Sequence, residues 1–113
     1  MSLTDKSILI IGCFDTKGDV FAYLRACIVA RGEKVITMNS GIFGTTDHFP
    51  VDFEAVEVAM EGSGDVLQLR SERDRGKAVD IMGKGASRLA GKLFTEGKIK
   101  AVIGMGGGGG TYI

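Results

Sequence analysis

The sequence predicts an α/β fold in which helices cover both faces of a parallel, Rossmann-like sheet, giving three layers. Three short apolar runs, at residues 7–13, 34–38 and 99–105, alternate with segments whose apolar residues recur every three to four positions. Glycine accounts for 18 of the 113 residues and proline for 1, which favours tight turns and close backbone packing. Strands and helices that alternate in this way build parallel sheets.

The first 38 residues predict one βαβ unit. Residues 7–13 form a continuous apolar run, which is typical of a strand buried on both faces. We predict a helix over residues 17–31, with Thr16 and Asp19 as its capping box and Gly32 as its stop. One apolar stripe of this helix faces the sheet and consists of Val20, Phe21, Leu24, Cys27 and Ile28. Residues 34–38 then form the second strand, joined by a right-handed connection.

The middle of the chain predicts a loop over residues 39–52 and a helix over 53–61 with Asp52 as its cap. After a turn, residues 66–69 are predicted as a short extended segment. Residues 72–96 have helical periodicity. Glycines at positions 76, 83, 85 and 91 interrupt it and indicate either close packing or a break near 83–85. Gly97 ends this helix before the third strand.

The expected strand order is 2-1-3, with the first strand in the centre. In this order the chain winds outward on one side of the first strand and then crosses to the other side. Ligands of open α/β sheets bind at such a reversal, beyond the carboxyl ends of the strands. The turn at residues 14–18 and the glycine-rich segment after the third strand would therefore share one crevice.

Composition and charge exclude several classes of protein. The 14 basic residues balance the 14 acidic ones, so no net charge favours nucleic acid or an anionic membrane as a partner. The longest apolar stretch, around residues 8–11, is far too short to span a bilayer. Nothing in the sequence indicates secretion, so we expect a cytoplasmic protein whose Cys13 and Cys27 are reduced thiols. The length sets an upper limit of one domain.

A run of glycines is the strongest functional signal in the sequence. Residues 104–111 read Gly-Met-Gly-Gly-Gly-Gly-Gly-Thr and directly follow the third apolar run. A loop of this kind points several backbone N–H groups into one small space, which suits a phosphate or a carboxylate. It lacks the Gly-Lys-Ser/Thr ending of a P-loop. The turn at residues 12–18 also lacks the dinucleotide fingerprint, which argues against NAD as a cofactor.

The second candidate segment is Asp15-Thr-Lys-Gly18, at a strand end and helix start. Lys17 would neutralise a phosphate, while Thr16 and the first helical N–H groups would donate hydrogen bonds to it. Asp15 would hold a metal ion or act as a catalytic base. The alternative is that Thr16 only caps the helix and that Lys17 is solvated.

Three further residues have weaker claims. Arg75 opens the long helix and would bind a carboxylate or phosphate, or form an exposed salt bridge. His48 is the only histidine, and we expect it to be solvated rather than a metal ligand. Cys13 is expected to be a buried, inert thiol rather than a nucleophile. The sequence therefore predicts no metal site.

Three segments together resemble a known family: residues 11–18 with 21–25, residues 74–79, and residues 104–111. The family is the ATP-binding group typified by the tomato mosaic virus resistance protein. Its resemblance covers nearly the whole chain and implies that residues 1–113 are the first part of an N-terminal nucleotide-binding domain, with a downstream domain absent. It also implies ATP contacts from Asp15, Thr16, Lys17, Gly18, Arg75, Gly106, Gly107, Gly108, Gly109, Gly110 and Thr111. Gly108 stands where the family has a serine, so one hydroxyl contact is lost.

These observations leave three functional hypotheses. The first is a module that binds a nucleotide, ATP with or without magnesium, within a larger protein of unknown reaction. The second is an interaction domain whose ligand only stabilises a surface for a protein partner. The third is part of a metabolic enzyme acting on a small phosphorylated or carboxylate substrate, with Asp15 or Cys13 as the catalytic group. With only about three strands, an unpaired sheet edge and an unfinished helix would be exposed, which further predicts self-association or a mobile chain end.

Overall fold

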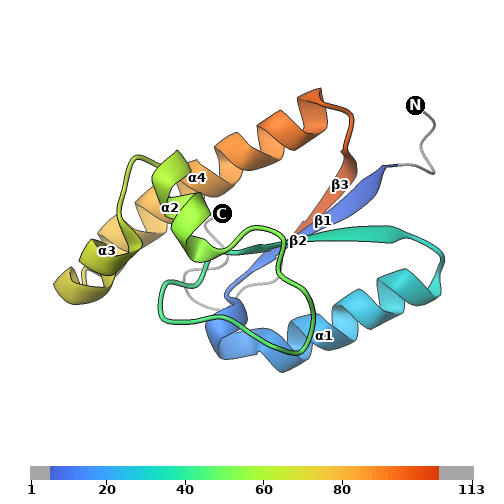
Figure 1. Ribbon diagram of the computed structural model, residues 1–113, viewed down its shortest axis with the longest axis horizontal. Helices are drawn as coiled ribbons and strands as arrows, with labels where there is room; N and C mark the ends of the chain where they lie inside the picture. Colours follow the sequence, from blue (N-terminus) through green and yellow to red (C-terminus); the bar gives the residue numbers. More distant parts are fainter. Residues whose placement is uncertain (1–5, 105–113) are drawn as a thin grey trace.

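The computed structural model describes residues 6–104 as three layers, with one helix below a parallel sheet and three helices above it (Figure 1). In chain order the elements are β1 (Ser7–Gly12), α1 (Phe14–Ala30), β2 (Lys34–Asn39), α2 (Ala55–Glu61), α3 (Val66–Glu72), α4 (Arg75–Thr95) and β3 (Ile99–Gly104). This architecture confirms the predicted α/β class. Residues 105–113, which include the glycine run, lie outside the described part of the chain.

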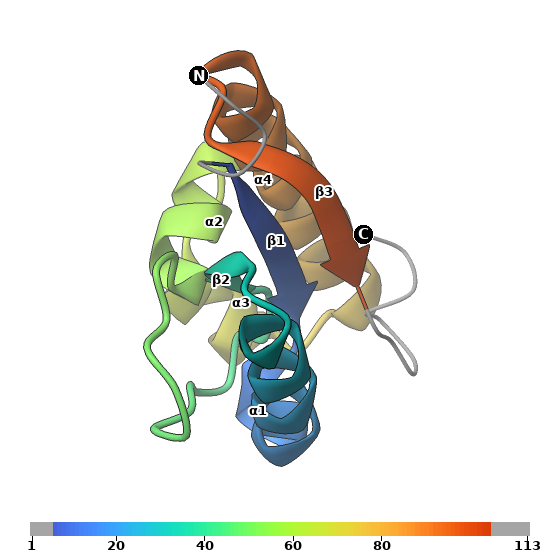
Figure 2. The same ribbon diagram turned by 90° about the vertical axis from the view of Figure 1, so that its right-hand side faces the viewer.

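The sheet has the strand order β2-β1-β3 with both pairings parallel, as predicted. Ile10 in the central strand is aligned with Thr37 of β2 and with Ile103 of β3. Figure 2 shows β1 between its two neighbours, with β3 at the outer edge. All three strands therefore end at the same edge of the sheet, next to the N-terminus of α1.

The face of the sheet below β1 packs on α1 through aromatic side chains. Phe14, Phe21 and Phe49 are buried there together with Ile10. The ring of Phe14 lies 5.0 Å, centroid to centroid, from each of the other two in edge-to-face geometry, which is favourable for aromatic pairs. These contacts fix the start of α1 beneath the end of β1.

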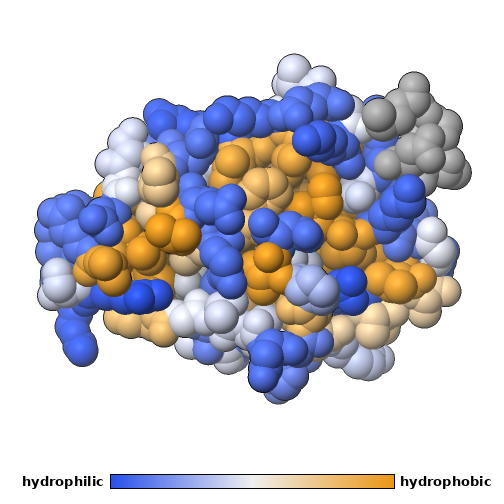
Figure 3. All heavy atoms as spheres, viewed as in Figure 1, coloured by the Kyte–Doolittle hydropathy of each residue, from blue (hydrophilic) through white to orange (hydrophobic). Residues whose placement is uncertain are grey.

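The opposite face packs on α2, α3 and α4 and forms the larger core. Its fully buried members include Leu9 and Met38 from the strands and Val58 from α2. Helices α2 and α4 approach closely because Gly85 of α4 faces the backbone of Val58. In Figure 3, hydrophobic residues gather over the middle of one face of the molecule, and hydrophilic residues follow the side occupied by α4.

The helix predicted over residues 53–61 has a different start and a different cap in the structure. Helix α2 begins at Ala55, and Glu54 forms its capping box with Glu57. Asp52, the predicted cap, instead accepts a hydrogen bond from the backbone N–H of Thr37 at 2.9 Å. Because the Asp52 carboxylate accepts from the β2 backbone, it does not cap α2, which begins three residues later.

The segment at residues 66–69, predicted as extended, is the first turn of α3. The carboxylate of Asp65 accepts a hydrogen bond from Leu67 N at 2.9 Å and so caps this helix. Val66 and Leu69 then lie on the same side and are buried in the core. Of the two predictions for the glycines in α4, close packing is right, because the helix runs unbroken through residues 83–85.

One ion pair links α3 to α4 and predicts a pH-dependent contribution to stability. The carboxylate of Glu72 lies 2.8 Å from Lys77 Nζ. The pKa of Glu72 is lowered from its usual value by the hydrogen bond from Lys77 and, next, by one from Gln68. A depressed folded-state pKa stabilises the fold above the ordinary carboxyl pKa, and this contribution is lost as the pH falls through the folded pKa.

We expect Lys77→Ala to raise the pKa of Glu72 toward its ordinary value in an NMR titration of the side-chain carboxyl. Lys84→Ala is the matched control, because Lys84 pairs with Asp80 on the exposed face of the same helix. An unchanged Glu72 pKa in Lys77→Ala would show that the pair does not form in solution.

Candidate functional site at the carboxyl edge of the sheet

Helix α1 begins at Phe14, directly after β1 and three residues earlier than predicted. Cys13 is the N-cap, and its carbonyl accepts hydrogen bonds from Thr16 N at 3.3 Å and Lys17 N at 3.0 Å. The hydroxyl of Thr16 also points to this carbonyl, at 3.5 Å. The predicted capping box of Thr16 and Asp19 is therefore wrong. Helix α1 also has a kink at Lys17, whose φ and ψ of −124° and 26° are not helical.

Asn39, the last residue of β2, connects this turn to the loop that follows. Its Oδ1 accepts hydrogen bonds from Phe14 N at 3.1 Å and Gly41 N at 2.9 Å. Its Nδ2 donates to Gly44 O at 2.8 Å and to Glu54 Oε1 at 3.2 Å. The side chain is fully buried and all four of its hydrogen-bonding positions are used. Asn39 therefore fixes where α1 starts relative to the β2 loop.

These hydrogen bonds limit what the start of α1 can bind. The N–H groups of Phe14, Thr16 and Lys17 already have acceptors within the described chain. The first-turn amides therefore offer a phosphate less than the sequence predicts. An anion beside this turn would therefore depend on groups other than these three amides.

Asp15 lies in the first turn of α1, and its two carboxylate oxygens differ in whether they accept a hydrogen bond. Its Oδ2 accepts a hydrogen bond from Phe43 N at 3.1 Å. Its Oδ1 is buried and has no hydrogen-bond partner among residues 6–104. A Cβ atom on Gly41 would lie 2.0 Å from this oxygen, so the carboxylate fits only against glycine. A buried carboxylate oxygen without a donor is costly and indicates a partner outside the described atoms.

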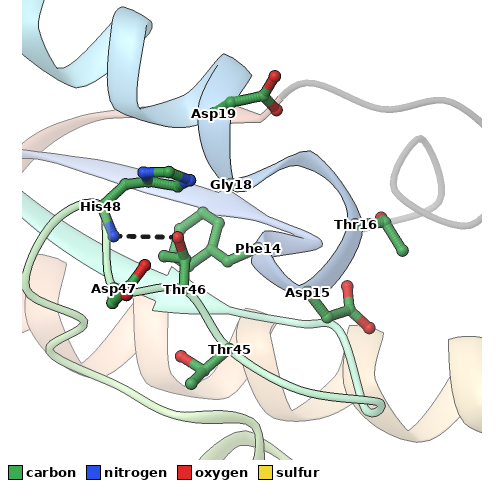
Figure 4. Close-up of a pocket in the computed structure, with 9 residues that line it drawn as sticks. All are labelled: Phe14, Asp15, Thr16, Gly18, Asp19, Thr45, Thr46, Asp47 and His48. Carbon is green, nitrogen blue, oxygen red and sulfur yellow. Dashed lines mark hydrogen bonds between the residues drawn. The ribbon is translucent and has the colours of Figure 1, made fainter.

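A cavity of about 460 Å³ lies between α1 and the loop after β2 (Figure 4). Asp15, Thr16 and Gly18 line it from α1, so the structure brings these three predicted residues together. The loop contributes Thr45, Thr46, Asp47 and His48, and the remaining lining residues are Phe14 and Asp19. The lining contains three carboxylates and neither lysine nor arginine, so the cavity itself favours hydroxyl or cationic groups over phosphate.

Gly18 lets the loop after β2 approach α1. A Cβ atom there would lie 2.6 Å from the hydroxyl oxygen of Thr46. That hydroxyl accepts a hydrogen bond from His48 N at 3.2 Å, as the dashed line in Figure 4 shows. His48 is exposed, in agreement with the expectation that it is solvated.

The other predicted site residues lie elsewhere. Lys17 is exposed beside the cavity and does not line it. Arg75 is exposed at the first position of α4 and is not in the cavity either. Gly106, Gly107, Gly108, Gly109, Gly110 and Thr111 lie outside the described residues.

Sequence reasoning missed three residues that shape this edge. Asn39 and Gly41 act through contacts described above, and Arg70 of α3 donates from Nε to the carbonyl of Ile42. No local signal identifies them, because each acts on a residue in another segment. Arg70 directly follows residues 66–69, which were predicted as extended, so its position in a helix was not predicted.

The cysteines and the other possible metal ligands do not form a recognisable site among residues 6–104. Cys13 Sγ lies 3.8 Å from Ser40 Oγ, and both cysteines are free. Within residues 6–104 no three histidine, cysteine or acidic side chains converge as a metal site. No helix in this range is long and apolar enough to cross a membrane.

The fold and this edge define a class: an α/β domain with a parallel sheet and a candidate ligand site beyond the strand ends. Residues 6–113 match the N-terminal domain of the uncharacterised protein family UPF0261, and the chain belongs to that family. It is similar to UPF0261 proteins of Clostridium tetani (34% identity over 109 residues) and Rhizobium meliloti (36% over 108 residues). Each match covers 96% of this chain, but only 27% and 26% of the respective relative.

A third relative, a UPF0261 protein of Mesorhizobium japonicum, is 38% identical over 108 residues, which are 96% of this chain and 26% of the relative. The chain thus spans about a quarter of the length of these curated relatives. No solved structure matches it significantly. The resemblance to the family of the tomato mosaic virus resistance protein is wrong as an assignment, because the matches identify UPF0261. That resemblance therefore no longer supports the ATP contacts that it implied.

Proposed function

We propose that this domain binds the phosphate groups of a nucleotide, ATP with magnesium, at the carboxyl edge of the sheet. The observation that supports the proposal is the strand order β2-β1-β3. It makes the ends of β1 and β3 neighbours at the point where the direction of winding reverses. The turn at residues 13–18 and Gly104, the residue at which the glycine run begins in the sequence, thus follow neighbouring strand ends.

The charged groups at this edge have distinct roles in the proposal. Lys17 is exposed next to the end of β1 and supplies the positive charge for phosphate. The buried Oδ1 of Asp15 is a ligand of the kind that magnesium prefers. Magnesium is commonly held by one or two carboxylates together with phosphate oxygens and water, so a single aspartate is sufficient. The hydroxyl-lined cavity beside Asp15 suits a polar, uncharged part of the ligand.

The test is a calorimetric titration of ATP–magnesium into the chain and into Lys17→Ala. We expect binding to the parent, and a loss of roughly tenfold or more in affinity for the variant, because a hydrogen bond to a charged group contributes about 1.5–3 kcal/mol. Lys34→Ala is the matched control: Lys34 is equally exposed but begins β2, at the opposite edge of the sheet.

The same titration with Asp15→Asn separates magnesium from phosphate recognition. We expect this variant to lose the magnesium dependence of binding and to keep affinity for ATP without metal. The proposal fails if neither the 113-residue chain nor the complete polypeptide, meaning the product of the whole reading frame that contains it, binds nucleotide. The hypothesis of a protein-interaction domain would then be the better one.

A further inference from the structure

The two outer edges of the sheet differ in how they are protected. The backbone of β2 is covered by the segment at Asp52 and Phe53, which pairs with it in parallel. Asp52 N and Phe53 N donate to Thr37 O at 3.1 and 3.0 Å, and Asn39 N donates to Phe53 O at 2.8 Å. No segment among residues 6–104 covers β3 in this way. An open strand edge is a template for a further strand.

The side chains of β3 are also only partly covered. Val102 is aligned with Leu9, and alignment places both on the face that α4 covers. Leu9 is fully buried, whereas Val102 remains 51% exposed. Ile99, at the start of the same strand, is buried in the core. Helix α4 therefore covers the beginning of β3 and leaves its carboxyl half open.

A shallow groove of about 580 Å³ runs along α4. Gly76, Val79, Gly83 and Ser87 line it at helical spacing, and the charged side chains of Asp80, Lys84 and Arg88 complete its lining. The four small residues occupy the flank of α4 opposite to the one where Gly85 contacts α2. Small side chains on one flank let a second helix approach closely. These small residues therefore lie away from α2, whereas Arg88, which also lines the groove, donates to Glu61 O of α2 at 2.7 Å.

We propose that β3 and this α4 groove receive a strand and helix from the same polypeptide beyond the residues described here. The incoming strand would pair in parallel with β3, and its connecting helix would lie in the groove. The handedness of crossovers supports this arrangement: the connection from β2 to β3 passes over the α4 face, and a further right-handed step outward from β3 must pass over that same face. The length of the curated relatives, of which this chain spans about a quarter, provides such a segment.

The test places Val102→Lys in the 113-residue chain and in the complete polypeptide encoded with it. In the short chain we expect Tm to stay within about 1 °C, because a half-exposed edge position accepts lysine. In the complete polypeptide we expect Tm to fall by roughly 5 °C or more, because the valine is then buried. Val56→Lys on α2 is the matched control, since Val56 is 49% exposed and lies away from β3, and it should leave both chains unchanged.

A second variant and an exchange measurement keep the proposal testable if Val102→Lys fails to fold in the complete polypeptide. Ser87→Trp fills the groove and should lower Tm in the complete polypeptide alone. Hydrogen exchange at Ala101–Ile103 should be at least about 100-fold slower in the complete polypeptide than in the short chain. Equal exchange in both would overturn the proposal, and so would a reading frame that ends at Ile113.

A second copy of the chain is the competing occupant of this edge. In that case the short chain would run at twice 11.9 kDa in sedimentation, and Val102→Lys would return it to a monomer. That result would overturn the proposal. None of these measurements uses a nucleotide, so their outcome is independent of the proposed function.

Discussion

Asn39→Ala is expected to lower the free energy of unfolding by about 3 kcal/mol. The substitution removes the acceptor of two buried backbone N–H groups, those of Phe14 and Gly41. Each buried donor left without a partner costs about 1–3 kcal/mol. The change should appear in urea denaturation followed by circular dichroism as a lower midpoint with an unchanged slope.

Ser40→Ala is the control for this experiment. Ser40 is also buried and is the next residue, but within residues 6–104 its hydroxyl has only the weak contact with Cys13 Sγ at 3.8 Å. We expect a change below about 1 kcal/mol for the loss of so weak a contact. Similar losses in the two variants would show that the cost comes from burial at this position and not from the Asn39 hydrogen bonds.

Asn39→Asp distinguishes the acceptor from the donor role of this side chain. An aspartate keeps an oxygen for Phe14 N and Gly41 N but places a charge beside Glu54 and the carbonyl of Gly44. The substitution also removes the donor to Gly44 O and Glu54 Oε1 and adds like-charge repulsion with Glu54. We therefore expect Asn39→Asp to be less stable than the parent at pH 7.

Gly85→Ala is expected to destabilise the protein by about 2–3 kcal/mol, although alanine is the better helix former. A Cβ atom at position 85 would lie 1.8 Å from the carbonyl oxygen of Val58. That oxygen belongs to the backbone of α2, so the contact is relieved only by moving the two helices apart. Thermal unfolding should show a lower Tm and a lower free energy of unfolding.

Gly91→Ala in the same helix is the matched control. Nothing lies within 4 Å of a Cβ atom built on Gly91. The substitution should therefore stabilise the protein by up to about 1 kcal/mol through helix propensity alone. If both variants changed stability in the same direction, the close approach of α2 and α4 would not exist in solution.

The alternation of strands and helices could be predicted from the sequence because it depends on local patterns. Apolar runs of strand length at residues 7–13 and 99–105 alternate with helical periodicity, and that alternation leaves few parallel topologies. The error at residues 66–69 arises from the same kind of reasoning. Four residues are too few to distinguish the period of a strand from that of a helix, and the cap at Asp65 and the core contacts of Val66 decide for the helix.

The candidate site could be predicted only in part. Asp15, Thr16 and Gly18 are neighbours in the chain, so a single turn suffices to bring them to one cavity. Asn39 lies 25 residues from Phe14, with which it forms a hydrogen bond, and no pattern in the sequence encodes that contact. The separation of Arg75 from the cavity also depends on where α4 begins in space and not on its sequence.

The sequence by itself determined the class of fold, the central position of β1 and the edge of the sheet where a ligand is expected. These follow from hydrophobic periodicity and from the handedness of connections, which act over a few residues or over whole elements. The tertiary structure alone decided that Asn39 accepts from the first amide of α1, that Gly41 receives the Asp15 carboxylate and that β3 is the strand left uncovered among residues 6–104. Each of these depends on atoms from distant segments meeting at distances of a few ångströms, and such meetings are fixed only when the chain is packed.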